Sequence, residues 1–244
     1  LEAFVQFSKK VSNELIVAYG LPISGLTYGI DVAADYKAFN LKITEKGYRF
    51  DLTTPNREFK DIFFNQMGIH NVSNALGALA MADQAGIDIN KSLLALESFP
   101  GVYRRMNLYR WRDIVIIDDY AHHPSEIDSV FKTIKTFYPK QKNCVVFQPH
   151  LFSRTRDFMS DFKTTLSKFD EVILMDIYPA REEPIKGVNA KILFDGISHT
   201  IKGYIEKNQI KKILKSSSAD VFALLGAGDI GEEIKKLKQE FINL

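Results

Sequence analysis

The second half of the chain contains continuous apolar runs, which constrain its fold more than any other feature. They alternate with stretches of helical periodicity and lie at residues 115–117, 144–147, 172–177 and 221–225. Strands that are apolar on both sides are buried on both faces, which is typical of a parallel sheet covered by helices. We therefore expect an α/β fold with a mainly parallel sheet, flanking helices and right-handed crossovers. In such sheets, ligands bind beyond the carboxyl ends of the strands.

Helical patterns and one hairpin accompany these runs. Pro124 suits the first turn of a helix whose apolar stripe comprises Ile127, Val130, Phe131, Ile134 and Phe137. A second helix is marked by Phe158, Phe162 and Leu166. Residues 106–109 and 114–117 predict a β-hairpin across a turn at 111–113.

The first hundred residues follow a different pattern. Short β-prone segments between Thr27 and Phe64, broken by polar turns at 45–47 and 54–56, predict an antiparallel meander. Two helices follow, at about 72–86 and 90–99, and the spacing of Leu1, Phe4, Val5, Val11 and Leu15 predicts an amphipathic helix at the start. We place a domain boundary near Arg105. The absence of a capping residue before the first helix favours a chain that begins inside a domain.

Composition narrows the classes of partner. The chain has 32 basic and 30 acidic residues spread along its length, which gives no electrostatic footprint of nucleic-acid or membrane binding. Cys144 is the single cysteine, so the chain cannot form an internal disulfide or a thiolate metal cage. No apolar run is long enough for a membrane span. We therefore expect a cytoplasmic protein with a small-molecule or protein partner.

The densest polar cluster is DDYAHHP at residues 118–124, between a predicted strand and a predicted helix. A loop in that position can direct the two carboxylates, Asp118 and Asp119, and the two imidazoles, His122 and His123, at a ligand. The alternative is that Asp119 or His123 caps the following helix. Histidine and aspartate also bind zinc or manganese, but the spacing lacks the helical HExxH pattern, so we assign no metal ligand.

A second cluster, FQPHLFSRTRDF at residues 147–158, follows another buried run. It contains His150, Arg154 and Arg156. An arginine there can bind a carboxylate or phosphate through two parallel hydrogen bonds. The arginines could instead simply decorate the start of a helix, although cations at a helix N-terminus oppose its dipole. That conflict favours an anionic ligand.

Three further motifs have more than one interpretation. Arg104 and Arg105, at the predicted boundary, could reach a nucleotide or form surface ion pairs. The segment 70–74 combines helix-capping residues with amides able to recognise a base edge, and capping is the simpler role. GAGDIG at 226–231 matches GxGxxG, but too little chain follows for the second strand with an acidic residue about 20 residues later. We interpret these glycines as permitting a tight turn and close packing.

In their order along the chain, six motifs resemble those of the Mur ligase family. They are GIHNVSNALGALAMA (68–82), GVYRRM (101–106), DDYAHHPSEI (118–127), FQPHLFSRTRDF (147–158), DIYPAREEPIKGV (176–188) and GAGDIG (226–231). DDYAHHP followed by FQPHxFSRT is similar to the branch of the family that adds L-alanine. The ordered set is much more specific than any single motif.

The resemblance implies a three-domain enzyme of which this chain holds part. Residues 1–105 would be a partial central ATP-binding domain, and residues 106–244 a C-terminal, Rossmann-like domain that binds the amino acid. The family's GxxGKT/S phosphate loop does not occur in the sequence. The upstream residues that help to hold Mg²⁺ in the family also have no counterpart here. We therefore expect the chain to be inactive by itself.

For the intact enzyme, the resemblance implies a ligase that uses ATP and Mg²⁺ to join L-alanine to UDP-N-acetylmuramate through an acyl phosphate. Its nucleotide-binding residues would be Asn74 for adenine, Arg105 for the phosphates or ribose, and Asp119, which would hold the ribose or orient the cleft. Its L-alanine pocket would comprise Tyr120, His122, His150 and Arg154. Within that pocket, Arg154 would bind the alanine carboxylate and His122 would contact the amine, so these two are the candidate catalytic residues. The alternatives are a Rossmann-like binding module and a related recycling ligase that adds a tripeptide to UDP-muramate.

Overall fold

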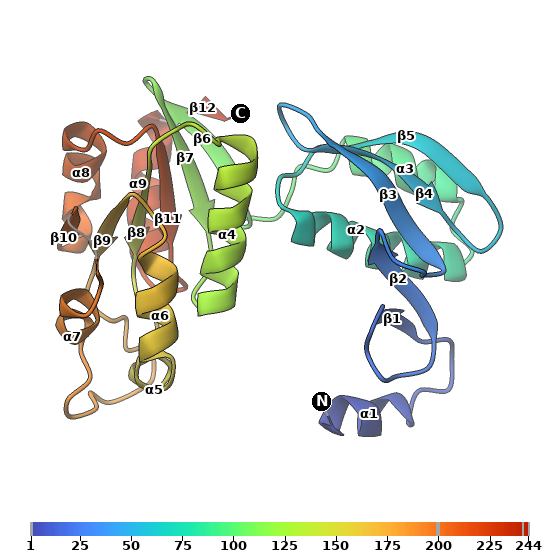
Figure 1. Cartoon of the computed structure of the whole chain (residues 1–244), viewed down its shortest axis with the longest axis horizontal. Coiled ribbons are helices and arrows are strands. Elements are labelled where there is room, and N and C mark those ends of the chain that lie inside the picture. Colours follow the sequence, from blue (N-terminus) through green and yellow to red (C-terminus); the bar gives the residue numbers. More distant parts are fainter. Residues whose placement is uncertain (1, 199–200, 241, 244) are drawn as a thin grey trace. The chain divides into compact units, whose positions relative to one another are not determined.

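The computed structural model describes residues 2–198, 201–240 and 242–243 (Figure 1). The described chain divides into two compact units, residues 1–100 and 101–244. The division falls a few residues before the predicted boundary near Arg105.

In its described residues, the first unit is a five-stranded sheet with three helices. The sheet order is β1-β2-β3-β4-β5. The elements are α1 (Glu2–Ser8), β1 (Ile16–Ala18), β2 (Leu26–Ile30), β3 (Tyr36–Ile43), β4 (Tyr48–Thr53), β5 (Glu58–Phe64), α2 (Ile69–Gln84) and α3 (Ile89–Glu97). The two predicted helices are confirmed as α2 and α3. The core of this unit includes Tyr36, Phe50, Leu52, Val72 and Leu76, all at most 1% exposed.

The predicted meander is only partly correct. Strands β3, β4 and β5 are antiparallel, but β1 with β2 and β2 with β3 are parallel. The chain between β2 and β3 passes through Asp31 in a left-handed conformation, with φ 52°. The Asp35 carboxylate then accepts hydrogen bonds from the Thr27 amide and hydroxyl, both at 2.7 Å. These hydrogen bonds hold the loop so that Tyr36 pairs with Tyr28 in a parallel register. The alternation of apolar and polar residues in the sequence does not reveal this pairing.

Two helix predictions in the first unit are wrong in detail. Helix α1 ends at Ser8, so Val11 and Leu15 lie outside it. The Leu15 carbonyl instead accepts a hydrogen bond from Leu26 at 2.8 Å, beside the pairing of β1 with β2. Residues 70–74 do not cap α2, because its N-cap is Gly68 with φ 92°. Asn71 donates from its side chain to the Met67 carbonyl at 2.7 Å.

The second unit holds the predicted α/β sheet. Its strands have the order β10-β9-β8-β11-β7-β6-β12 in the described residues. The strands are β6 (Asn107–Trp111), β7 (Ile114–Asp119), β8 (Asn143–Phe147), β9 (Glu171–Leu174), β10 (Lys202–Tyr204), β11 (Val221–Leu225) and β12 (Ile242–Asn243). The helices are α4 (Pro124–Phe137), α5 (Phe152–Asp157), α6 (Met159–Leu166), α7 (Ala190–Asp195), η1 (Lys207–Gln209), α8 (Ile210–Ser216), α9 (Ile230–Leu237) and η2 (Lys238–Glu240).

The predicted topology of this sheet is confirmed. Strands β7 to β11 are parallel, and β6 forms the predicted antiparallel hairpin with β7. The long predicted helix is α4. The apolar pattern of the sequence does not reveal β10, β12, α7 or α8. Each of these elements is short, and a short apolar pattern is a weak signal.

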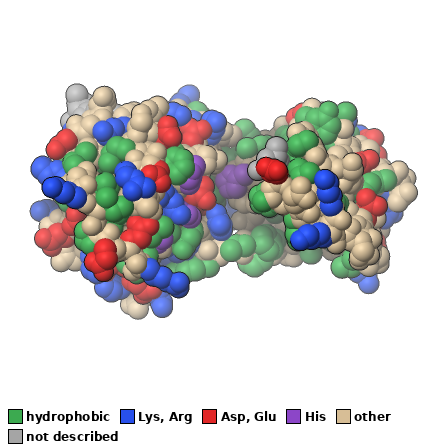
Figure 2. Space-filling view, turned by 90° about the horizontal axis from the view of Figure 1, so that it is seen from below, with side chains coloured by type: hydrophobic (Ala, Val, Ile, Leu, Met, Phe, Trp, Pro, Cys, Tyr) green, Lys and Arg blue, Asp and Glu red, His purple; other side chains and the backbone are tan. Residues whose placement is uncertain are grey.

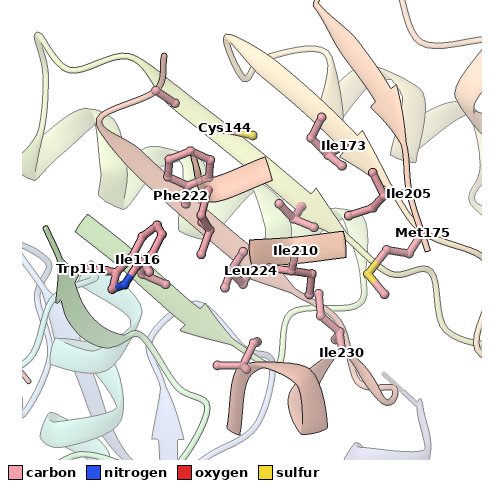
Figure 3. Close-up of a cluster of buried hydrophobic side chains, with 14 of the residues drawn as sticks. Trp111, Ile116, Cys144, Ile173, Met175, Ile205, Ile210, Phe222, Leu224 and Ile230 are labelled. Carbon is pink, nitrogen blue, oxygen red and sulfur yellow. The ribbon is translucent and has the colours of Figure 1, made fainter. Parts of the chain in front are cut away.

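Side chains of both sheet faces form the core of the second unit. Figure 3 shows one face, where Phe222 and Leu224 of β11 lie with Trp111, Cys144, Ile210 and Ile230. Successive strand residues point to opposite faces, so the neighbours of Phe222 face the other helices. There, Phe147 of β8 contacts Phe162 of α6, with ring centroids 5.4 Å apart.

The strand register brings the carboxyl ends of four strands level with one another. Leu225 pairs with both Asp119 and Phe147, and Phe147 pairs with Leu174. Strand β11 lies between β7 and β8, although it comes later in the sequence. The loops that follow β7, β8, β9 and β11 therefore meet at one edge of the sheet, where ligands bind in open α/β folds.

Replacing Phe222 should destabilise the second unit strongly. The side chain is fully buried in the middle of the sheet. We expect Phe222→Ala to lower the free energy of unfolding by about 3–5 kcal/mol, because the substitution removes apolar contacts and leaves a cavity. Urea unfolding followed by fluorescence of the single tryptophan, Trp111, measures this, since Trp111 belongs to the same cluster.

Ile192→Ala is the matched control, because this α7 side chain is 40% exposed. We expect it to change the unfolding free energy by less than about 1 kcal/mol. Equal losses for the two variants would show that Phe222 is not the core residue described above.

Candidate functional site

Four side chains predicted for one pocket do lie together at the carboxyl edge of the sheet. The rings of Tyr120 and His122 are 5.4 Å apart, and those of His122 and His150 are 5.9 Å apart. An Arg154 guanidinium nitrogen lies 3.3 Å from Nδ1 of His150. Tyr178, which the sequence analysis did not single out as a site residue, stacks on His150 with centroids 5.7 Å apart. In the space-filling view, histidines reach the surface of the second unit among side chains of both charges (Figure 2).

The loop between β7 and α4 is held by a capping box. His123 is the N-cap of α4, and its Nδ1 accepts a hydrogen bond from the Ser125 amide at 3.3 Å. The Glu126 carboxylate accepts from the amides of His122 and His123, at 2.8 and 3.0 Å. The capping interpretation is therefore confirmed for His123. His122, one residue earlier, lies among the site residues.

The contacts of His122 indicate which ring nitrogen carries its proton. Nδ1 lies 2.9 Å from the Tyr120 carbonyl and 3.3 Å from a Glu126 carboxylate oxygen. Both partners only accept hydrogen bonds, so Nδ1 is the protonated nitrogen in the neutral ring. Nε2 is then left as an acceptor that can receive a hydrogen bond from a ligand.

The loop between β8 and α5 carries His150 and Arg154 in a constrained backbone. Leu151 has φ 73°, a conformation that costs a non-glycine residue about 1–3 kcal/mol. Its amide donates to the Tyr178 carbonyl at 3.0 Å, and the Tyr178 amide donates to the Pro149 carbonyl at 2.8 Å. The segment after β9 therefore holds the segment after β8 through paired main-chain bonds.

The environment of His150 favours the neutral ring. Burial lowers the pKa of His150 below its ordinary value of 6.5, and the nearby Arg154 and His122 lower it further, while Glu182 acts in the opposite direction. A guanidinium only donates, so the contact from Arg154 requires an unprotonated Nδ1 on His150. The geometry and the pKa direction agree that His150 is neutral near pH 7.

Asp119 supports the loops of the second unit. It is 5% exposed, and its two oxygens accept hydrogen bonds from the amides of Met106 and Ala121, at 2.8 and 2.7 Å. Burial raises the pKa of Asp119, although both amide bonds act to lower it. Its side chain thus organises the main chain on both sides of the β6–β7 hairpin, and a direct contact with a ribose stays a prediction.

The neighbouring arginines 104 and 105 have different environments. Arg105 is exposed. Arg104 is buried: its Nε donates to Asp118 at 3.0 Å, and its terminal nitrogen donates to the Gly226 carbonyl at 2.5 Å. Its guanidinium also lies over the Tyr120 ring, 5.4 Å from the centroid. Arg104 is therefore engaged inside the second unit, whereas Arg105 is accessible to solvent and its contact with a nucleotide stays a prediction.

The GAGDIG loop, residues 226–231, packs against Gln148 and the Arg104 guanidinium. An added Cβ at Gly226 would lie 2.7 Å from the Gln148 carbonyl, and one at Gly231 would lie 2.5 Å from the Arg104 guanidinium. Gly226 also has φ 147°. These positions confirm the interpretation that the glycines serve a tight turn and close packing.

Asn74 lies in α2 of the first unit and is exposed. Among the described residues, no group of three or more histidine, cysteine, aspartate or glutamate side chains could hold a metal ion. Within the same ranges, no helix has the length and apolar character to cross a bilayer.

Family models match both units of the chain. The Mur ligase middle domain matches residues 5–82, and the Mur ligase glutamate ligase domain matches residues 104–230. The second match alone covers more than half of the sequence. The chain belongs to the Mur ligase family.

Curated relatives and solved structures give a finer comparison. The chain is 46% identical to the UDP-N-acetylmuramate–L-alanine ligase of Christiangramia forsetii over 245 aligned positions, covering 99% of the chain and 54% of the relative. It is also 46% identical to the ligase of that name from Flavobacterium psychrophilum, again covering 54% of the relative. The crystal structure of the UDP-N-acetylmuramate-alanine ligase from Thermotoga maritima matches with a TM-score of 0.71 and 27% identity, over 88% of this chain and 47% of that one. The chain thus spans about half the length of the curated relatives that it matches.

Removing the buried guanidinium should destabilise the second unit. Asp118 is fully buried, and among the described residues its remaining charged partner would be Lys238, whose ammonium lies 3.3 Å away. We expect Arg104→Met to lower the free energy of unfolding by about 3 kcal/mol, because an incompletely paired buried carboxylate remains. Arg105→Met, at the exposed neighbouring position, should leave stability within about 0.5 kcal/mol. Urea unfolding of both variants measures the difference, and equal stabilities would contradict the network.

The pKa of His150 should depend on Arg154. We expect His150 to titrate below 6.5 in NMR spectra of the histidine rings, and Arg154→Gln to raise its pKa by removing a positive charge. Because the folded state disfavours protonation, the neutral ring's contribution to stability is complete above pH 6.5 and is lost as the pH falls through the folded pKa. Arg156→Gln is the control, since Arg156 pairs with Asp157 at 2.7 Å. A His150 pKa that Arg154→Gln leaves unchanged would contradict the contact.

Proposed function

We propose that this chain is part of an ATP-dependent ligase that joins L-alanine to UDP-N-acetylmuramate in peptidoglycan synthesis. The cluster of Tyr120, His122, His150 and Arg154 is the main support for this proposal. It holds a cation for the carboxylate of an amino acid and a hydrogen-bond acceptor for its amine. The names of the similar ligases support the same substrates.

In this proposal, the amino acid lies at the carboxyl edge of the second unit's sheet. Arg154 binds the alanine carboxylate through a charge-assisted hydrogen bond, and neutral His150 orients the guanidinium. His122 directs Nε2 at the amine and accepts a hydrogen bond from it. A neutral imidazole can also take the proton that the amine loses on attack, which is the catalytic role that we assign to His122.

The reaction has two steps. The muramate carboxylate first takes the γ-phosphoryl group of ATP, which yields an acyl phosphate and ADP. The alanine nitrogen then attacks the acyl carbon, the bond from carbon to the phosphate oxygen breaks, and amide, phosphate and one proton result. The residues of this chain serve the second step by aligning the amine, since fixed geometry replaces a chance encounter.

Nucleotide contacts are assigned to three residues. Asn74 would contact the adenine, Arg105 the phosphates or ribose, and Asp119 the ribose, directly or by ordering the main chain. The described residues do not form a Mg²⁺ site by themselves. We assign Mg²⁺ and most ATP contacts to other parts of the intact ligase.

The two regions have separate roles in this proposal. Residues 1–105 belong to the central ATP-binding domain, and residues 106–244 form the amino-acid-binding domain. The chain by itself lacks catalytic activity, because the phosphate loop motif is absent from its sequence. The intact enzyme works in the cytoplasm, in accord with the single cysteine.

The direct test is phosphate release that requires ATP, UDP-N-acetylmuramate and L-alanine together. We expect activity from a version extended upstream through a phosphate loop, and none from this chain alone. In the extended enzyme, Arg154→Gln should raise the KM for L-alanine by about 10–100-fold, because a charged hydrogen bond to the carboxylate is lost.

Arg156→Gln, two residues further along α5, serves as the matched control and should leave this KM unchanged. An extended enzyme that is inactive with all three substrates would exclude the proposed reaction. A wild-type KM in Arg154→Gln would exclude the carboxylate assignment.

A second candidate is the recycling ligase that adds a tripeptide to UDP-muramate. A cavity of about 400 Å³ supports this candidate, because one of its lining residues is Tyr178, whose ring stacks on His150. None of Tyr120, His122, His150 and Arg154 lines the cavity, so it would hold the part of a peptide that extends beyond the alanine site. Its rim also carries Asp176, Glu206 and Lys207. Competition between L-alanine and the tripeptide in the extended enzyme separates the candidates, since the preferred amine has the higher kcat/KM.

A further inference from the structure

The helix that carries Arg154 begins without a polar cap of its own. Helix α5 starts at Phe152, and the residue before it is Leu151, whose side chain has no acceptor for the first free amides. Unsatisfied amides at a helix start need a partner, which is usually an oxygen of the N-cap side chain. For α5 the partner comes from a distant segment.

Glu182 supplies the missing acceptor. One carboxylate oxygen accepts a hydrogen bond from the Ser153 amide at 2.9 Å, and the other accepts from the Ser153 hydroxyl. Both bonds hold the pKa of Glu182 below its ordinary value, and the bond from the Ser153 hydroxyl has the larger effect. The positive charge of Arg154 lowers the pKa of Glu182 further. A negative charge at this end of a helix is also stabilised by the helix dipole.

The chain between Tyr178 and Glu182 completes a strap across the loop after β8. Tyr178 forms a parallel bridge with His150 outside the named strands. The strap then turns through Ala180, which has φ 54°, and the Glu182 amide donates to the Pro179 carbonyl at 3.0 Å. The strap therefore contacts His150 through the Tyr178 ring and the start of α5 through the Glu182 carboxylate.

We propose that Glu182 is a positioning residue of the amino-acid site, which fixes the first turn of α5 so that Arg154 and His150 present one preformed surface to the substrate carboxylate. This inference rests on the proposed function for its substrate. Glu182 acts through Ser153 and does not itself touch the amino acid. Its carboxylate also gives the site a fixed negative charge close to Arg154.

The free chain tests the structural half of this proposal without any substrate. We expect Glu182→Ala to speed hydrogen exchange of the Ser153 amide by about tenfold, because the cap is lost. The pKa of His150 should fall further, since Glu182 opposes the lowering effects of burial, Arg154 and His122. Glu182→Gln separates the two effects: the His150 pKa should fall as in the alanine variant, while the amide oxygen retains part of the cap. NMR of this chain measures both quantities.

The extended ligase tests the substrate half. Glu182→Ala should raise the KM for L-alanine by about tenfold with a smaller change in kcat, because the carboxylate surface is no longer preformed. Glu182→Gln should recover part of this loss. Glu183→Ala, at the exposed neighbouring position, is the control and should match the wild type in every measurement.

The outcomes separate this inference from the proposed function. Unchanged Ser153 exchange and His150 pKa in Glu182→Ala would overturn the positioning role, whatever the substrate. Altered exchange with a wild-type KM for L-alanine would also overturn it, because the cap would then serve stability alone. A wild-type ligase that ignores L-alanine would instead overturn the proposed substrate, and the measurements on the free chain would still decide whether Glu182 holds α5.

Discussion

The buried ion pair between Arg104 and Asp118 connects the segments on which the second unit's ligand edge depends. Arg104 lies just before the β6–β7 hairpin, Asp118 lies in β7, and the guanidinium also binds the carbonyl of Gly226 after β11. One cation thus joins three segments that are distant in sequence. A buried charge keeps its favourable energy only while every partner stays in place, so each loop restrains the others. The lack of a side chain at Gly231 leaves the space that the Arg104 guanidinium occupies.

The carboxylates of Glu126 and Glu182 hold the loops that carry the proposed amino-acid site. Glu126 binds the amides before α4 and approaches His122, and Glu182 binds the start of α5 beside Arg154. Each acidic residue therefore satisfies free amides at a helix start and fixes a neighbouring polar side chain. Burial first, and then the adjacent guanidinium of Arg154, lower the pKa of His150 and favour its neutral ring.

The sequence alone predicted the parts of this arrangement that depend on local patterns. Continuous apolar runs predicted the parallel sheet, and the motifs after its strands predicted that His122, His150 and Arg154 lie near one another. The parallel pairing of β2 with β3 was missed, because it depends on one loop conformation at Asp31 and not on alternation. The role of Glu182 was missed for a related reason: its partner is 29 residues away. The H-x-x-E spacing of His123 and Glu126 did contain a capping-box signal, but histidine is an unusual N-cap.

The close approach of Gly228 to Tyr178 links the last loop of the sheet to the histidine cluster. A Cβ at position 228 would lie 2.6 Å from the Cβ of Tyr178, an atom that cannot move without its backbone. Any larger residue at 228 would therefore shift the ring that stacks on His150. The sizes of residues 178 and 228 are coupled, and the space that a GxGxxG loop leaves for a pyrophosphate elsewhere is filled here by the chain itself. A side chain at position 228 would therefore require the backbone at position 178, and with it the loop after β9, to move.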